Sequence, residues 1–185
     1  MKPKVLLNEK QVAAAIEALA KAIVAEKKNL KKVVFIGVLK RGDHIADRIA
    51  AEVKRLTKTS VPTGYMDITL YRDDFSSLLN KPLPQETVIP VDLTDKEVIL
   101  IDDVLFTGRS TRAALEAIMD YGRPKKIQLC ALIDRSHREI PIHADFVGKD
   151  VVTEYSDRIK VHLKEIDGKD EILLIKQEVP ATLNV

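Results

Sequence analysis

The sequence of 185 residues predicts an α/β domain in which a central, mostly parallel sheet is flanked by helices. Three observations support this prediction. Apolar runs of strand length alternate along the chain with segments whose apolar residues recur at helical spacing. The runs are apolar on both faces, which is typical of strands buried in a parallel sheet. Polar clusters follow three of the runs, at the edge where such sheets bind ligands.

Two helices and two strand regions are expected in the first part of the chain. Asn8 can cap a helix that ends near Asn29, because the apolar residues between them recur every three to four positions. Residues 33–39 form an apolar run and are predicted to be a buried strand. Asp43 can cap a second helix that reaches about residue 56, and a second strand region is expected over 62–70.

The second part of the chain begins with a segment that lacks periodicity. Residues 71–88 are mostly polar, and a stretch of this kind inside a compact domain is typical of a functional lid. Regular elements are expected to resume after it. They are a strand at 98–101, a helix at 113–119 that ends at Gly122, a strand at 127–133 and a short strand at 145–148.

The composition indicates one cytoplasmic domain. Residues 1–185 suit a single domain, with a lid at about 71–88 and a C-terminal hairpin at about 159–176 around Asp167-Gly168. Cys130 is the single cysteine, so no disulfide can form within the chain. The chain has no run of 18 apolar residues and does not start like a signal peptide, so we expect no membrane span. The formal net charge of +2 neither requires nor excludes nucleic acid as a partner.

The most informative segment, residues 99–111, joins a strand-like run, two adjacent acids and a loop of small residues. Asp102 and Asp103 suit sugar hydroxyls or a hydrated metal ion. Residues 107–111 open a helix, and loop amides at a helix N-terminus suit a phosphate. The segment therefore predicts a sugar-phosphate site. For an Asp-Asp pair taken alone, a strand–loop–helix unit with solvated acids is the alternative.

Five segments together resemble the pyrimidine-operon attenuator/uracil phosphoribosyltransferase family, called PyrR, of the type I phosphoribosyltransferases. The segment described above resembles the superfamily's signature for 5-phosphoribosyl-1-diphosphate (PRPP). Purine enzymes share this signature, but not Leu-Tyr-Arg-Asp-Asp or Asp-Arg-Ser-His-Arg-Glu in this form. The resemblance covers almost the whole chain, and its five segments are 37–42, 67–74, 89–94, 99–114 and 134–142.

The resemblance implies a type I phosphoribosyltransferase fold with a flexible lid and a small hood. It also implies the glycosyltransferase reaction of uracil with PRPP, which gives UMP and pyrophosphate in pyrimidine salvage. Such a reaction needs no protein nucleophile, because alignment and stabilisation of the leaving-group charge carry the catalysis. Mg²⁺ is expected to arrive with PRPP, and no metal site made by the protein alone is expected.

The resemblance also implies which residues form the site. Arg72, Asp102 and Asp103 are the expected catalytic residues, the acids holding the ribose and the arginine closing over pyrophosphate. A solvated charge paired with Asp73 or Asp74 is the alternative for Arg72. A non-proline cis peptide is implied in the pyrophosphate loop. The residues expected to contact PRPP are Leu39, Lys40, Arg41, Gly42, Asp102, Asp103, Val104, Leu105, Phe106, Thr107, Gly108, Arg109, Ser110 and Thr111.

Three residues are expected at the base. Purine enzymes of this fold carry, at the strand end that aligns with Asp134, a lysine that donates to the purine oxygen. An ionised carboxylate cannot donate, which argues against hypoxanthine and guanine. Phe146 and Val147 align with a stacking ring and a backbone pair for the base, although a role in the core fits Phe146 equally well.

The family's second role implies binding to an mRNA leader hairpin by a homodimer or higher homo-oligomer. His137, Arg138, Lys149 and Arg158 are the candidates for RNA contacts. The first helix is rich in alanine and His143 is a histidine, at places where regulatory members carry arginines. Two alternatives stay open: a purine phosphoribosyltransferase with an altered base pocket, and an RNA-binding regulator with little catalysis.

Overall fold

The computed structural model describes residues 3–73 and 83–177. Its centre is a five-stranded sheet with the order β3-β2-β4-β5-β6, in which every pair of neighbours is parallel. This arrangement confirms the α/β architecture predicted from the sequence. The strands are β2 (Val33–Val38), β3 (Thr63–Met66), β4 (Glu97–Leu105), β5 (Lys126–Asp134) and β6 (Phe146–Asp150).

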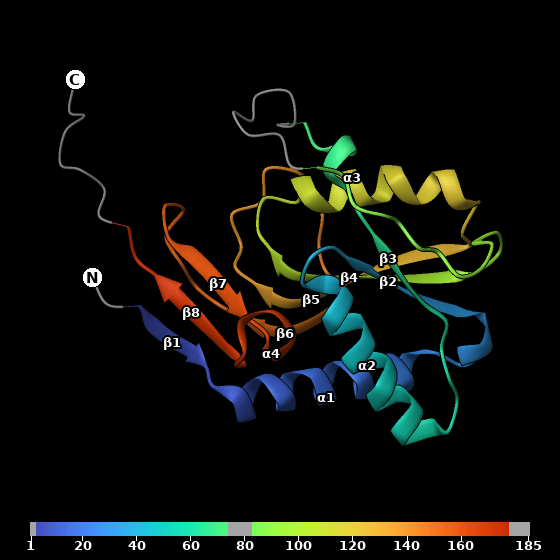
Figure 1. Cartoon of the computed structure of the whole chain (residues 1–185), viewed down its shortest axis with the longest axis horizontal. Coiled ribbons are helices and arrows are strands. Elements are labelled where there is room, and N and C mark those ends of the chain that lie inside the picture. The colour runs from blue at the N-terminus through green and yellow to red at the C-terminus, as the bar shows by residue number, and fades with distance from the viewer. Residues whose placement is uncertain (1–2, 74–82, 178–185) are drawn as a thin grey trace.

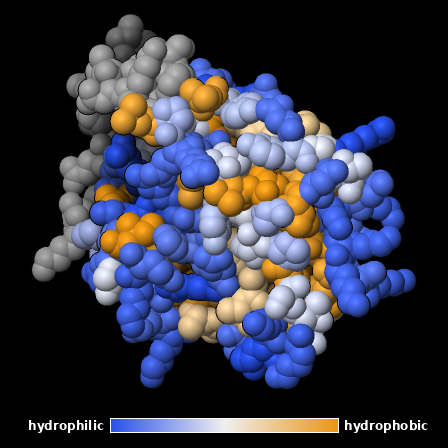
Figure 2. Space-filling model, turned by 45° about the vertical axis from the view of Figure 1, so that its right-hand side comes forward, coloured by the Kyte–Doolittle hydropathy of each residue, from blue (hydrophilic) through white to orange (hydrophobic). Residues whose placement is uncertain are grey.

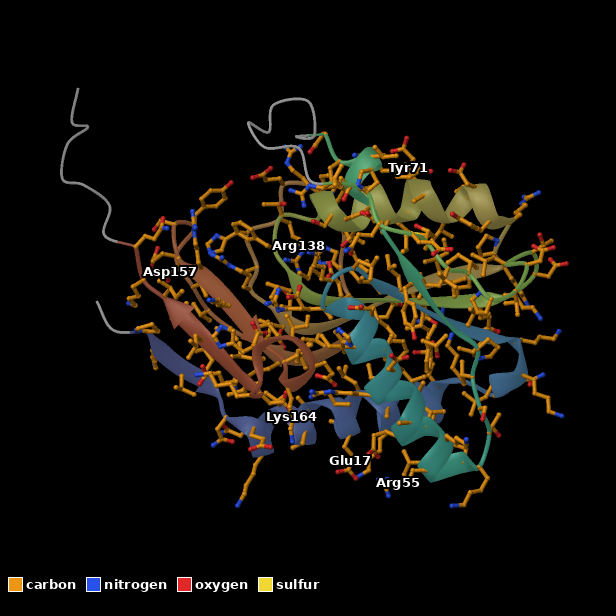
Figure 3. The ribbon with its side chains drawn as sticks, viewed as in Figure 1. Glu17, Arg55, Tyr71, Arg138, Asp157 and Lys164 are labelled. Carbon is orange, nitrogen blue, oxygen red and sulfur yellow. The ribbon has the colours of Figure 1, made fainter. Side chains whose placement is uncertain are left out.

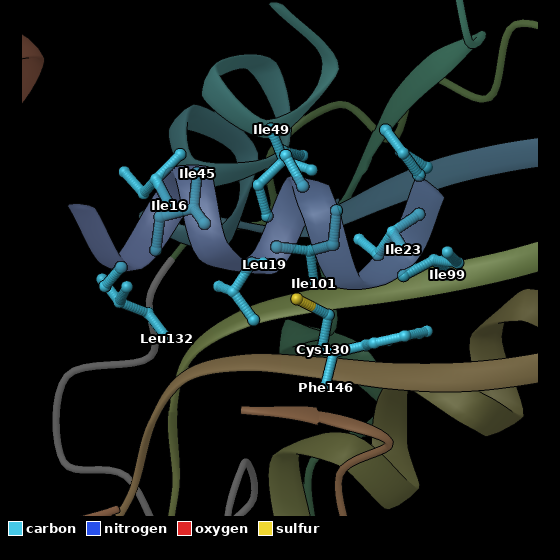
Figure 4. Packing of buried hydrophobic residues seen from close by; sticks show 14 of the residues in the cluster. Ile16, Leu19, Ile23, Ile45, Ile49, Ile99, Ile101, Cys130, Leu132 and Phe146 are labelled. Carbon is cyan, nitrogen blue, oxygen red and sulfur yellow. The ribbon is translucent and has the colours of Figure 1, made fainter. Parts of the chain in front are cut away.

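Helices cover both faces of this sheet (Figure 1). On one face lie α1 (Glu9–Glu26) and α2 (Gly42–Thr57), and on the other lies α3 (Arg109–Ile118). The alternate side chains of β4 and β5 point to opposite faces, so each face has its own apolar cluster. Figure 4 shows the larger cluster, where isoleucines of both helices pack over the strands. Short 3₁₀ helices, η1 (Leu30–Lys32), η2 (Thr69–Tyr71) and η4 (Met119–Tyr121), join the longer elements.

A smaller antiparallel sheet, which we call the hood, has the strand order β1-β8-β7. It lies toward the carboxyl ends of the main strands (Figure 1). Its elements are β1 (Lys4–Leu7), β7 (Arg158–His162), α4 (Lys164–Asp167) and β8 (Glu171–Ile175). β7 and β8 pair as expected for the C-terminal hairpin, but Asp167-Gly168 is not a two-residue turn. Gly168, with φ +74°, instead ends α4 and donates its amide to the carbonyl of Lys164.

Two element boundaries correct the sequence predictions. Asn8 caps α1 as expected, but Asp43 lies within the first turn of α2, whose N-cap is Arg41. β4 does not stop at residue 101 but continues to Leu105. The reason is that its pairing with β2 ends at Ile101, whereas its pairing with β5 continues to Leu105. The end of β4 is therefore open on the β2 side.

Most of the surface is hydrophilic, and the face in Figure 2 shows hydrophobic residues in separate patches. Exposed apolar side chains include Leu70, Met119 and Val152. Within residues 3–73 and 83–177, no helix combines the length and the apolar character needed to cross a membrane.

Candidate active site

Asp102 and Asp103 lie in the open end of β4. Asp102 is 9% exposed, and its Oδ1 accepts a hydrogen bond of 2.9 Å from the amide of Asp103. Burial, and then the charge of Asp103, raises the pKa of Asp102 to about 8. Burial also raises the pKa of Asp103. Buried acids with raised pKa values are typical of ligand sites, and groups that donate hydrogen bonds or carry positive charge would favour their ionised forms.

The phosphate loop, which we define as residues 106–111, connects β4 to α3. Gly108 adopts φ +91°, a conformation that suits glycine, and it is the N-cap of α3. The carbonyl of Thr107 accepts the amides of Glu139 and Ile140 at 3.0 and 3.1 Å, which fixes the loop from behind. The loop lines a first cavity of about 650 Å³ together with Asp102. Amides at the start of α3 give this cavity the character of an anion site.

The predicted pyrophosphate loop, residues 39–42, lies beside a second cavity of about 370 Å³. Its Leu39–Lys40 peptide is cis, as the family resemblance implied. Leu39, Lys40 and Arg41 line this cavity, and so does Asp103. Gly42 has a different role: a Cβ atom there would lie 2.4 Å from the carbonyl oxygen of Ile101. The glycine therefore permits the loop to approach the end of β4.

The start of the predicted lid lies between these two cavities. Arg72 lines both, and its positive charge opposes the effect of burial on the pKa of Asp102. The alternative for Arg72 is an ion pair with Asp73 or Asp74. Asp73 accepts a hydrogen bond from Arg109 of the phosphate loop at 2.5 Å. The other offered partner, Asp74, and the rest of the lid to residue 82 lie outside the described residues.

A third cavity of about 500 Å³ lies on the hood side of the phosphate loop. Arg135, Tyr155 and Asp157 are among its lining residues. Val104 lines all three cavities, so they meet beside the two acids. The second cavity is on the β2 side of β4, because Val38 of β2 lines it, and the third is on the β5 side, because Arg135, directly after β5, lines it. This arrangement can hold a sugar phosphate between two further groups.

Comparisons with known proteins agree with this geometry. A family model described as "Phosphoribosyl transferase domain" matches residues 4–164. A protein of Chloroflexus aurantiacus named Bifunctional protein PyrR is 47% identical over 173 residues, which are 94% of this chain and 95% of that protein. A protein of the same name from Latilactobacillus sakei is 53% identical over 156 residues, covering 83% of this chain and 87% of that protein. The chain belongs to the PyrR family of phosphoribosyltransferases.

Solved phosphoribosyltransferases share the fold at low sequence identity. The hypoxanthine phosphoribosyl transferase of Trypanosoma cruzi has a TM-score of 0.71 at 15% identity, over 94% of this chain and 91% of that one. The hypoxanthine-guanine phosphoribosyltransferase (hpt-2) of Bacillus anthracis has a TM-score of 0.67 at 22% identity, over 95% and 100%. These likenesses confirm the predicted type I phosphoribosyltransferase fold.

In this member of the PyrR family, the base residues predicted on β6 do not lie at the cavities. Phe146 is 5% exposed and packs beside Cys130 in the core (Figure 4). Phe146 therefore has the core position given above as its alternative, because its register with Cys130 places it at the start of β6, whereas the cavities lie beyond the strand's end. Its role toward the base stays a prediction. Val147 is the next residue, and it is not among the described residues that line the three cavities. Asp134 is the last residue of β5, and its carboxylate accepts hydrogen bonds from the amide of Ser136 and the guanidinium of Arg138.

The four candidates for RNA contacts differ in their surroundings. Lys149 and Arg158 are exposed. His137 is half-buried and its Nε2 lies 2.6 Å from the carbonyl oxygen of Thr153. Arg138 donates to the carbonyls of Phe106, Ser136 and Ile142 at 2.7–3.0 Å, and it lies between the hood and α3 (Figure 3). Arg138 therefore supports the phosphate loop, and its role toward RNA stays a prediction.

Arg135 is the part of the site to which the sequence assigned no role. It is 4% exposed, and its guanidinium carbon lies 4.0 Å from the centre of the Phe106 ring. It donates to the carbonyls of Glu154 and Asp157 at 2.8 and 2.6 Å and to the hydroxyl of Thr153 at 3.2 Å. Arg135 thus fixes residues 153–157 against the phosphate loop. Its position directly after a buried strand was the available sequence signal.

The acids of the site suit a cation that brings most of its own ligands. Within the described part of the chain, no group of three or more histidine, cysteine or acidic side chains could hold a metal ion. The buried Asp102 and the half-buried Asp103 both line the second cavity, and Asp102 also lines the first. Mg²⁺ keeps several non-protein ligands when one or two carboxylates hold it, so this donor set fits Mg²⁺ bound together with a phosphorylated substrate.

Proposed function

We propose that the protein transfers the phosphoribosyl group of PRPP to uracil and releases UMP and pyrophosphate. The observation that carries this proposal is that three cavities meet at Val104, next in the chain to Asp102 and Asp103. One cavity suits a phosphate, and the other two lie on opposite sides of β4. Membership of the PyrR family supports PRPP and uracil as the substrates, with the whole chain, lid and hood included, acting as one unit.

Each part of the reaction has a place in this geometry. The phosphate loop binds the 5′-phosphate, the acids accept hydrogen bonds from the ribose hydroxyls, and the pyrophosphate loop holds the leaving group. Uracil enters the third cavity. The base nitrogen then reaches C1 of the ribose from the side opposite the pyrophosphate, so one C–N bond forms as the C–O bond breaks, and the proton of that nitrogen passes to the departing pyrophosphate. Catalysis consists of this alignment together with the positive charge of Lys40, Arg41 and Arg72 at the leaving group.

Mg²⁺ enters this scheme with PRPP. It offsets the negative charge of the pyrophosphate when bound, and Asp102 and Asp103 are the residues that would hold it. The same two residues carry a second consequence of their burial. Because their pKa values are raised, the two carboxyl groups retain protons that an incoming cation and the ribose hydroxyls would displace. We expect binding of Mg²⁺ and PRPP to release protons, which calorimetry in buffers of different ionisation enthalpy measures.

A pyrimidine fits the end of β5 better than a 6-oxopurine does. Asp134 lies where purine enzymes of the fold carry a lysine. Its carboxylate accepts hydrogen bonds from the amide of Ser136 and the guanidinium of Arg138. The carboxylate of Asp134 therefore offers no donor for a purine oxygen. Arg135 orders the carbonyl-rich loop of residues 153–157 beside the third cavity, and backbone groups of this kind recognise the edge of a small base.

Product formation from competing bases tests the proposal. Purified protein with PRPP and Mg²⁺ is given uracil, hypoxanthine or guanine, and the nucleotide products are separated and measured. We expect UMP from uracil and at least about a hundredfold lower rate with either purine, in line with selectivity that rests on hydrogen-bonding groups. Preferential turnover of a purine would replace uracil in the proposal. Absence of turnover with all three bases would refute the proposed enzymatic activity.

A second function, binding of a pyrimidine-operon mRNA hairpin, is favoured by relatives that are named bifunctional. Lys149 and Arg158 are exposed cations that can contact RNA phosphates. Electrophoretic mobility shifts with the organism's own operon leader, with and without UMP, test this function. We expect Lys149→Ala with Arg158→Ala to weaken binding and to reduce its dependence on salt. Sedimentation of the same protein tests the expected homo-oligomer.

A further inference from the structure

Two arginines of α2 join the hood to the rest of the molecule, and they differ in where they lie. Arg41, the N-cap of α2, places Nη2 3.2 Å from both carboxylate oxygens of Asp167 at the end of α4. Arg48, about two turns further along α2, donates to Glu165 and Asp170 at 2.6–2.9 Å. Arg41 lines the second cavity, whereas Arg48 is not among the described residues that line it.

Arg41 lies between Asp167 of the hood and Asp103 of the site. Arg41 and Asp103 line the second cavity together, and Asp167 meets the same guanidinium from the hood. The Nε of Arg41 is buried and has no hydrogen-bond partner among the described residues. The hydrogen bonds to Asp167 therefore fix the direction of this guanidinium.

Asp167 is itself held in place. The amide of Leu163 donates to its Oδ2 at 3.0 Å, and its side chain is 20% exposed. Burial alone would raise the pKa of Asp167, but the Leu163 amide and the charge of Arg41 outweigh it and keep the pKa below its usual range. An ionised, anchored carboxylate can restrict the many rotamers of an arginine before any ligand arrives.

We infer that Asp167 is a positioning residue that holds Arg41 at the pyrophosphate subsite, so that the hood sets the affinity for the pyrophosphate group. This inference rests on the proposed function, because it takes the second cavity as the pyrophosphate subsite. A guanidinium that is ordered in advance loses little freedom when it binds a phosphate oxygen. Without Asp167, the ligand has to order Arg41, and Arg41 can turn to Asp103 instead.

Asp167→Asn and Glu165→Gln form a matched pair of variants. Each removes one carboxylate of α4 from an arginine of α2, but only Asp167 contacts an arginine that lines the cavity. Titration calorimetry with Mg²⁺–PRPP and with Mg²⁺–pyrophosphate measures affinity without any turnover. We expect D167N to weaken both ligands five- to twentyfold and E165Q to change them less than twofold. Equal losses in the two variants, or none in D167N, would overturn the inference.

A double-mutant cycle separates positioning from a general effect on the hood. In an Arg41→Ala background, D167N should cost no further affinity, because the side chain that it positions is gone. An undiminished effect of D167N in that background would refute the role of Asp167. UMP formation is measured on the same samples: a wild-type protein that binds PRPP but forms no UMP would refute the proposed reaction alone. If wild-type protein binds neither ligand, both conclusions fall.

Discussion

The phosphate side and the pyrophosphate side of this site are constructed differently. The proposed phosphate side is one continuous segment, residues 106–111, in which we expect backbone amides and one glycine conformation to do most of the binding. The pyrophosphate side gathers side chains from the loop at 39–42, the lid, the end of β4 and the hood. The first should tolerate changes of side chain but not of backbone, and the second should respond in the opposite way. Mutations that change either the backbone of the phosphate side or the side chains of the pyrophosphate side test the comparison.

The largest expected effect comes from the acids that both sides share. Asp102→Asn together with Asp103→Asn should reduce UMP formation by about a thousandfold or more, because the ribose and the leaving group lose their anchor. The fold should remain, since both carboxylates are disfavoured by burial. Steady-state rates and thermal unfolding measure the two effects. Asp150→Asn, an exposed acid at the end of β6, is the control. Substantial turnover by the double variant would place the active site elsewhere.

Arg72 carries the next largest effect and belongs to the pyrophosphate side. Arg72→Ala should lower kcat by about a hundredfold, because a positive charge at the departing group is lost. The change should appear mainly in kcat if the arginine acts on the transition state. Arg123→Ala, an exposed arginine before β5, should leave the kinetics unchanged. A variant whose kcat stays within threefold of the wild type would make Arg72 a loop charge.

Gly108→Ala tests the dependence of the phosphate side on its backbone. A residue other than glycine at φ +91° should cost about 1–2 kcal/mol of stability and weaken PRPP binding about tenfold. Gly168→Ala is a matched control, because Gly168 also has a positive φ, +74°, with open space around it. Both variants should lose stability in denaturant unfolding, but only the first should lose affinity. Equal affinities would show that the loop backbone does not determine binding.

The titration of Asp102 predicts how stability depends on pH. Its folded pKa of about 8 lies above the value in an unfolded chain, so the folded state favours the protonated acid. That stabilisation is complete below the unfolded pKa and is lost as pH rises toward 8. The free energy of unfolding without ligand should fall by more than about 1 kcal/mol between pH 5 and pH 8. Asp102→Asn should flatten this dependence, and an unchanged slope in the variant would assign it to another group.

The smallest effect is expected from a contact on the outer surface of the phosphate side. Glu139 accepts a hydrogen bond from Arg109 at 2.5 Å, but the two side chains are 31% and 51% exposed to solvent. Glu139→Gln should therefore leave the melting temperature nearly unchanged and change PRPP binding by less than twofold. Thermal unfolding and calorimetry check this. A tenfold loss of affinity would mean that the phosphate side also depends on side-chain pairs.

The same difference explains what the sequence could predict. The strand–loop–helix unit and the acids beside it were predictable because they belong to one short continuous motif, and the cis peptide was implied by the family resemblance. The end of β4 was placed four residues too early, because pairing with β5 and not local composition determines where that strand ends. Such pairing depends on partners that are distant in sequence.

Long-range contacts were outside the reach of local patterns. Phe146 was placed at the base because it aligned with a known position, but its register with Cys130 turns it into the core. The pairing of Arg41 with Asp167 spans most of the chain, and no spacing rule connects two such residues. Strand β1 was also missed, because four residues carry too little periodicity to be recognised without their partner β8.

The pairing of β1 with β8 has a consequence for protein synthesis. Lys4 pairs with Leu174, so the first strand of the hood leaves the ribosome long before its partner is translated. The five-stranded sheet and the phosphate loop can form in the interval. A translation product cut short before residue 171 would therefore keep a phosphate-binding loop on an unfinished scaffold. On the function proposed above, we expect completion of the hood to be the last step that makes a nascent chain ready to hold pyrophosphate.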